Sequence, residues 1–250
     1  APAAYFSATV PMFVAVVAVL RWRGRPMAQA GVGALACAYS NLVMLGLPLV
    51  RLAYGEAGFA VLLTIVSVHS LVLLTMASVV VELGGSGPAG DVAGRRARIL
   101  AVVRSSLLHP VILPIFAGIG WSLTGWRVPG PIDTALSLAG SAGPTMCLLL
   151  LGASLAQFEP KRELRGAIAL TVVKNLVHPL LAWSLGRWVF GLDPLTLAVV
   201  VMAASLPIGA NVYLFAQRHG VAMPQVSAGV TLSTVVTGLA LGPLLAWFRG

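Results

Sequence analysis

Long runs of uncharged apolar residues recur along the chain and constrain its fold more than any other feature. They cover about 1–20, 27–50, 57–81, 105–126, 134–158, 166–186, 194–217 and 221–248. A helix needs about 20 apolar residues to cross the hydrocarbon core of a bilayer, so each run is long enough for one crossing. The chain is 58% hydrophobic and 9% charged, which leaves little material for a soluble domain. The sequence therefore predicts an all-α polytopic membrane protein with eight spans in the lipid bilayer.

The basic residues lie in short loops and indicate the orientation of these spans. The loops after spans one, three, five and seven carry eleven of them, whereas the opposite side carries four, and cytosolic loops are the basic ones. Both ends of this segment are therefore expected outside the cytosol. The net charge of +9 reflects this topology and does not indicate a nucleic-acid partner. The eleven are Arg21, Arg23, Arg25, Arg95, Arg96, Arg98, Arg104, Lys161, Arg162, Arg165 and Arg218; the four are Arg51, Arg127, Arg187 and Arg249.

Two of the spans are interrupted by Pro, Gly and Asn, and they indicate an internal repeat. The stretches are "NLVMLGLPLVRLAYGEAG" from Asn41 and "SLPIGANVYLFAQRHGVA" from Ser205. Each interrupted span is preceded by one helix and followed by a long one, so spans one to three correspond to spans six to eight. Because the loop charges give the two sets opposite orientations, the repeat is predicted to be inverted, as in many secondary transporters.

The repeat predicts the domain organisation. The linker "ELGGSGPAGDVAGRRAR" begins at Glu82 and has the Gly-rich and Arg-rich composition of a flexible cytosolic segment. Residues 1–81 would be the last three helices of the first repeat, 82–104 the linker, and 105–248 a complete five-helix repeat. Spans four and five then lack counterparts, so two helices in about 60 residues are expected before Ala1, giving ten in all. The absence of an initiating Met fits this expectation, and a removed signal peptide is the alternative.

The interruptions predict a binding site for an anion. A break frees backbone N–H and C=O groups where no water is present, and it persists when it lines a cavity or binds a ligand. The half-helix that starts after a break presents a partial positive charge. The alternative is a simple proline kink whose Asn bonds a neighbouring helix. The candidate substrate-binding residues at the two breaks are Asn41, Gly46, Pro48, Pro207, Gly209 and Asn211.

Three further polar side chains fall inside apolar spans. Lys174 lies about eight residues into its span, and ionisable groups within the membrane are usually functional, although a lysine can also extend to the interface. His178 is one helical turn further on, so the two residues could together compensate an anionic substrate or relay a proton. His69 is interpreted as a core residue that bonds a neighbouring Ser or a backbone carbonyl.

Several classes of function and ligand are disfavoured. All seven acidic residues fall in loops or at span ends, so a sodium or proton site built on a buried carboxylate is not visible. Cys37 and Cys147 lie inside apolar runs, so neither a disulfide nor a metal site is expected, and no cofactor is indicated. The chain has no H-E-x-x-H, no intramembrane aspartate pair and no nucleotide-binding G-x-x-x-x-G-K-[ST] motif, so an enzyme or an ATP-driven pump is disfavoured.

Five motifs resemble the auxin efflux carrier family, which includes plant auxin exporters and bacterial permeases for malate or malonate. They are "SNLVMLGLPL" at 40–49, "HPVILPIFAGIGWSL" at 109–123, "AGPTMCLLLLGASLAQF" at 142–158, "VVKNLVHPLLAW" at 172–183 and "ASLPIGANVYLFAQRHG" at 204–220. The family usually has Asn where this chain has His109. The resemblance implies two inverted five-helix repeats whose broken helices, here spans two and seven, cross at mid-membrane. It also implies the inner membrane of a bacterium and is compatible with a homodimer.

These features favour a secondary transporter of a small carboxylate, working by alternating access around the crossing of the two broken helices and coupled to a proton or sodium ion. An uncoupled uniporter or an anion channel on the same fold is the alternative. An intramembrane enzyme is less favoured.

Overall fold

The computed structural model describes residues 1–84, 100, 104, 112–155 and 164–249, and these residues form helices without a regular strand. Four described helical stretches are long and apolar enough to cross a membrane: Pro2–Trp22, Leu42–Leu83, Leu164–Val189 and Met223–Phe248. The predicted all-helical class of a polytopic membrane protein is confirmed. The helices are α1 (Pro2–Trp22), α2 (Met27–Ala38), η1 (Leu42–Gly46), α3 (Leu47–Leu83), α5 (Ile112–Leu123), α6 (Gly130–Leu155), α7 (Leu164–Val172), η2 (Val173–Val177), α8 (His178–Ser184), η3 (Leu185–Val189), α9 (Pro194–Ser205), α10 (Ala210–His219) and α11 (Met223–Arg249).

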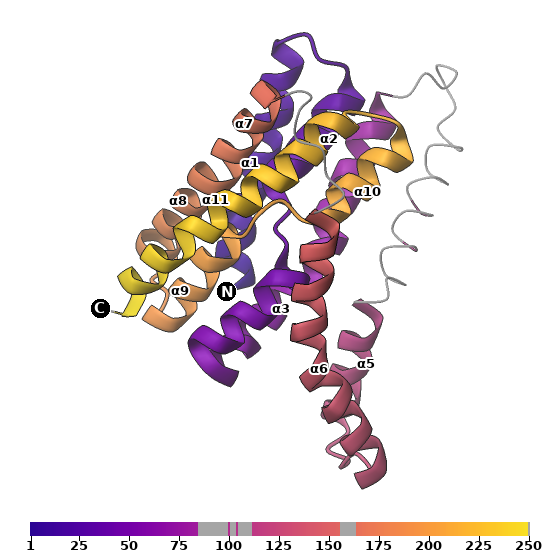
Figure 1. Ribbon diagram of the computed structural model, residues 1–250, viewed down its shortest axis with the longest axis vertical. Helices are drawn as coiled ribbons and strands as arrows, with labels where there is room; N and C mark the ends of the chain where they lie inside the picture. Colours follow the sequence, from indigo (N-terminus) through magenta and orange to yellow (C-terminus); the bar gives the residue numbers. More distant parts are fainter. Residues whose placement is uncertain (85–99, 101–103, 105–111, 156–163, 250) are drawn as a thin grey trace.

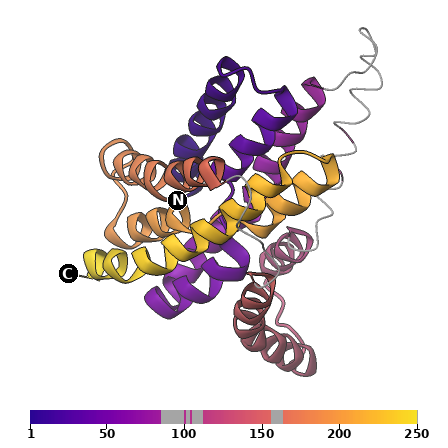
Figure 2. The same cartoon turned by 45° about the horizontal axis from the view of Figure 1, so that its top comes forward.

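The helices from the two ends of the chain pack together in one bundle. Figure 1 shows α1, α2 and α3 beside α7 to α11, and Figure 2 shows the same grouping after rotation. The pair α5 and α6 extends away from this bundle in both views. The end of α1 packs on α2, and α11 packs on α7 and α10. Residues far apart in the sequence therefore meet in the bundle, where the two interrupted spans lie.

The second and third predicted spans are joined more closely than the sequence indicates. Helix α3 continues through the expected loop, and only Gly55 leaves the helical conformation, with φ +62° and ψ −158°. A positive φ is accessible to glycine without a side-chain penalty, so the chain turns sharply at this one residue. The predicted loop between spans two and three is therefore a kink.

The described helices bury two apolar cores and a set of polar side chains, which we call the polar layer. One core includes Phe13, Leu35 and Val212, and the other includes Leu62 and Met202. The polar side chains come from the middle of the membrane-type helices and from the helix breaks. They are Thr9, Ser40, Asn41, His69, Ser70, Lys174, His178, Ser205, Ser233 and Thr237. Buried polar groups need hydrogen-bond partners, so this layer is the place to look for a site.

Part of the predicted organisation lies outside the described residues. This applies to His109 and to most of the linker 82–104. The division at 1–81 and 105–248, the inverted repeat and the two further helices before Ala1 stay predictions.

Candidate functional site

The two interrupted spans meet at their breaks and bond each other through the main chain. Ser40, between α2 and η1, pairs in antiparallel fashion with Ile208, between α9 and α10. The Asn41 N–H donates to the Pro207 carbonyl at 2.9 Å, and the Gly209 N–H donates to the Tyr39 carbonyl at 3.0 Å. The breaks are therefore not simple kinks. Each supplies hydrogen bonds that the other needs in a region without water.

Glycines at the breaks permit this close approach. A Cβ on Gly209 would lie 2.7 Å from a ring carbon of Tyr39, and a Cβ on Gly46 would lie 2.8 Å from a methyl group of Leu206. Pro207 lacks an N–H group and so cannot continue the hydrogen bonding of α9, although its carbonyl accepts the bond from Asn41. Pro48 is buried in the first turn of α3. The four Pro and Gly candidates thus shape the two breaks.

A cavity of about 160 Å³ opens beside the paired breaks. It is lined by the start of η1, at Leu42 to Met44, and by the start of α10, at Ala210 and Asn211. The Nδ2 of Asn211 donates to the Tyr39 hydroxyl at 3.1 Å, and that hydroxyl is 2.7 Å from the Ser70 Oγ. Asn41 also lines the cavity, so both amides predicted from the sequence reach one space. Helix starts and amide donors suit a negatively charged group.

Lys174 lies on η2 and is completely buried, with an exposed fraction of 0%. Its ammonium does not extend to the interface, so that alternative is wrong. The Nζ donates to the Ala204 carbonyl at 2.6 Å, in the last turn of α9. That carbonyl has no intrahelical donor because the helix ends at the break, and a helix C-terminus favours a cation. Lys174 does not line the cavity.

His178 is fully hydrogen-bonded between Lys174 and Thr9. The Thr9 hydroxyl donates to the Tyr5 carbonyl at 2.7 Å, so at the His178 contact of 2.9 Å its oxygen accepts from Nε2–H. Nδ1 then accepts from the Lys174 Nζ at 3.3 Å. The imidazole is therefore the neutral Nε2–H tautomer. The predicted proximity of His178 to Lys174 is observed, and the pair forms part of a chain of bonds that joins α1, α8 and α9.

His69 differs from its predicted role as a hydrogen-bonded core residue. It is 2% exposed, yet neither ring nitrogen has a hydrogen-bond partner in the described structure. The expected serine partner, Ser70, bonds Tyr39 instead. The ring packs against Tyr39 at a centroid distance of 4.5 Å, and the residue lines the cavity. The sequence shows an imidazole in mid-span, but its lack of partners emerges only from the packing.

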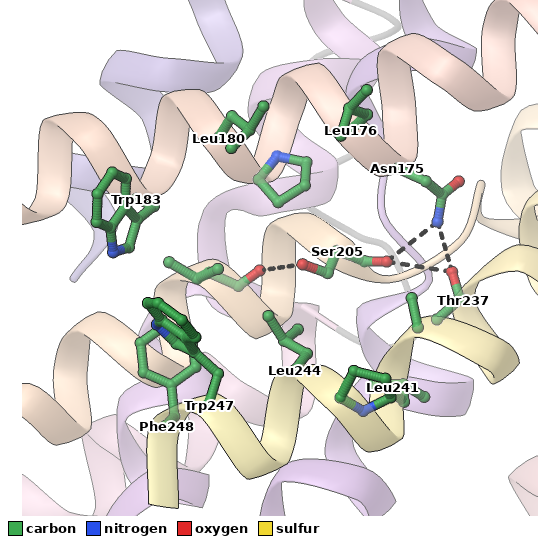
Figure 3. A pocket seen from close by; sticks show the side chains of 14 residues that line it. Asn175, Leu176, Leu180, Trp183, Ser205, Thr237, Leu241, Leu244, Trp247 and Phe248 are labelled. Carbon is green, nitrogen blue, oxygen red and sulfur yellow. Dashed lines mark hydrogen bonds between the residues drawn. The ribbon is translucent and has the colours of Figure 1, made fainter. Parts of the chain in front are cut away.

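A second, larger groove of about 480 Å³ runs between α8, α9 and α11 (Figure 3). At one end, Asn175 and Thr237 both donate to the main-chain oxygen of Ser205, at 3.2 and 3.1 Å. These bonds satisfy another carbonyl at the end of α9. The rest of the lining is apolar and includes Trp183 and Trp247, so this groove lacks the charge and donors of an anion site.

The described helices carry no group of three or more His, Cys, Asp or Glu side chains that could hold a metal ion. The interrupted helices, the polar layer and the intramembrane cavity define an integral, multi-pass membrane protein. The sequence matches the family described as "Membrane transport protein" over residues 1–242, and the chain belongs to that family. This confirms the resemblance to auxin efflux carriers. The family and the relatives below are transporters, not enzymes.

Two proteins have sequences similar to this chain. The chain is similar to a protein named "Putative malonate transporter" from Rhizobium meliloti (strain 1021), with 28% identity over 247 residues, covering 96% of this chain and 74% of that protein. It is also similar to "Auxin efflux carrier component 5" from Arabidopsis thaliana, with 22% identity over 230 residues. That alignment covers 80% of this chain and 65% of the plant protein.

Proposed function

We propose that this chain is a secondary transporter of a small organic carboxylate that binds in the cavity at the paired breaks. The observation that carries the proposal is the convergence of two half-helix starts and two amides, Asn41 and Asn211, on one intramembrane space. Backbone N–H groups at a helix start and side-chain amides both donate to a carboxylate. The family membership supports transport, and the name of the bacterial relative supports a carboxylate substrate.

The charges around the cavity also favour an anion. The described acidic residues are Glu56, Glu82, Asp133 and Asp193, and they lie at helix ends or at the Gly55 kink. Lys174 adds a buried basic side chain to the polar layer. When it is protonated, its charge in a medium of low dielectric constant attracts an anion far more strongly than it would in water. The modest cavity volume favours a small substrate such as malonate or malate.

Transport would occur by alternating access, with the broken helices moving together with their bundle while access to the cavity switches sides. The main-chain bonds between the breaks support movement as one body. We also propose the plasma membrane of a bacterium as the location of the chain, and the bacterial origin of the Rhizobium relative supports it.

The test is uptake of labelled malonate and malate into proteoliposomes that contain the full-length transporter. Asn41→Ala and Asn211→Ala are each expected to reduce uptake at least tenfold, because each removes a donor to the carboxylate. Gln217→Ala removes an exposed amide from the same helix as Asn211 and serves as the control. Wild-type uptake in both cavity variants would contradict the proposed site. A uniporter or channel would show uptake that follows the membrane potential alone.

A further inference from the structure

His69 is the one cavity residue whose polar atoms are buried and unbonded. Neither ring nitrogen has a hydrogen-bond partner of good geometry in the described structure, although the main chain of Ser40 lies close to the ring. Burial of an unsatisfied polar group lowers the stability of the fold. Protein interiors rarely tolerate this cost without a functional reason. Since His69 lines the cavity, a molecule that enters the cavity could supply the hydrogen-bond partner that the ring lacks.

The groups around His69 determine what that molecule can be. Tyr5 of α1 and Tyr39, the residue that follows α2, pack against the ring at centroid distances of 5.7 and 4.5 Å. Lys174 and His178 are the other buried basic residues of the polar layer, and His178 packs on the same Tyr5 ring at 5.4 Å. No carboxylate of the described residues is among these neighbours. A proton on His69 would therefore have no carboxylate of the described residues to balance it whenever the cavity holds no anion.

An anion in the cavity would balance the charge of a proton on His69. A carboxylate near His69 attracts a proton to the imidazole, and a protonated imidazole in turn strengthens the binding of the carboxylate. Such a mutual effect is a coupling free energy and is reciprocal by thermodynamic necessity. The arrangement thus joins two events, substrate binding and proton binding, at one side chain.

We propose that His69 takes up one proton together with the carboxylate and so makes this transporter a proton-coupled symporter. This inference rests on the proposed function. The proton comes from water on the side where the substrate enters, binds a ring nitrogen of His69, and forms an N–H donor to a carboxylate oxygen. On the opposite side the carboxylate leaves and the proton returns to water, so no oxidant or other reactant is required.

The experiment is calorimetric titration of the detergent-solubilised full-length protein with malonate at about pH 7.5, in buffers with different ionisation enthalpies. The apparent binding enthalpy changes with the buffer in proportion to the protons taken up. We expect about one proton per malonate in the wild type, because binding and protonation are linked. His69→Gln keeps a hydrogen-bonding side chain that cannot be protonated at this pH. The number of protons that this variant takes up per malonate should fall to nearly zero, while malonate still binds. His219→Gln, at the end of α10, is the matched control and should behave as the wild type.

The outcomes separate the two proposals. If the wild type binds neither malonate nor malate, the proposed function fails, and the inference fails with it. If the wild type binds malonate without proton uptake, or if His69→Gln takes up as many protons as the wild type, only the inference is overturned. If His69→Gln does not fold, a wild type that binds malonate without proton uptake still overturns the inference. Uptake into proteoliposomes gives a second readout, since an imposed proton gradient should drive the wild type and not His69→Gln.

Discussion

The two buried histidines of the polar layer, His69 and His178, show how differently the same side chain can be used. Both pack edge-on against Tyr5, with centroid distances of 5.7 and 5.4 Å. His178 has partners on both nitrogens, in Lys174 and Thr9, whereas His69 has none and borders the cavity. An imidazole with hydrogen-bond partners on both nitrogens stabilises the fold, and one without partners beside a cavity is available to a ligand. Substitution of His178 should therefore mainly lower stability, whereas substitution of His69 should mainly lower transport.

The largest loss of stability is expected for His178→Leu. The change removes the acceptor of the Lys174 ammonium and the donor to Thr9, and leaves both groups buried without these bonds. Unsatisfied buried groups of this kind cost about 2–4 kcal/mol in total. Thermal unfolding of the purified protein in detergent would show a lower Tm. An unchanged Tm would mean that the hydrogen-bonded chain does not stabilise the bundle.

Lys174→Met should have the next largest effect on stability and should weaken substrate binding as well. It leaves the Ala204 carbonyl without its donor, at a cost of about 1–3 kcal/mol, and removes the buried positive charge. The same thermal unfolding measurement tests the first effect, and malonate titration should show an affinity lower by about tenfold or more. Equal affinity in the variant and the wild type would show that the Lys174 charge does not reach the substrate.

The opposite end of α9 offers a smaller effect for comparison. Asp193 caps this helix by accepting a hydrogen bond from the Thr196 N–H at 3.0 Å. Hydrogen bonds from the Thr196 side chain and from this N–H hold the pKa of the carboxyl below its usual value. Because the folded pKa is lowered, the stabilisation is present above the unfolded pKa and is lost as the pH falls through the folded value. Asp193→Ala should lower the Tm slightly at neutral pH, and the difference from the wild type should vanish in acid. A difference that persists in acid would assign the effect to something other than the ionised cap.

The smallest effect on stability is expected for His69→Leu. No hydrogen bond is lost, and an unsatisfied polar group is replaced by an apolar one, so the Tm should stay the same or rise. Uptake of malonate should nevertheless fall. Measured together with His178→Leu, this variant tests the comparison directly: a large drop in Tm for His69→Leu would indicate a structural partner for the ring and would remove the contrast between the two histidines.

The sequence predicts the fold better than it predicts the roles of individual side chains. Apolar runs and loop charges depend on local composition, so the helical spans and both interruptions could be located from the residues alone. The resemblance implied that the two broken helices cross, but the pairing of Ser40 with Ile208 was not predicted, because it joins residues 168 positions apart. The burial of Lys174 and the missing partners of His69 could not be predicted, since each depends on which groups α9 and α2 bring within hydrogen-bonding distance.

The main-chain bridge between the breaks has a consequence for how such proteins diversify. The bonds from Asn41 to Pro207 and from Gly209 to Tyr39 use only backbone atoms, so they do not depend on most of the neighbouring side chains. Under the proposed function, substitutions along the cavity wall would alter which molecule binds while the main-chain bonds between the breaks persist. A single scaffold of this kind is well suited to evolve new substrate preferences through a few changes at the crossing.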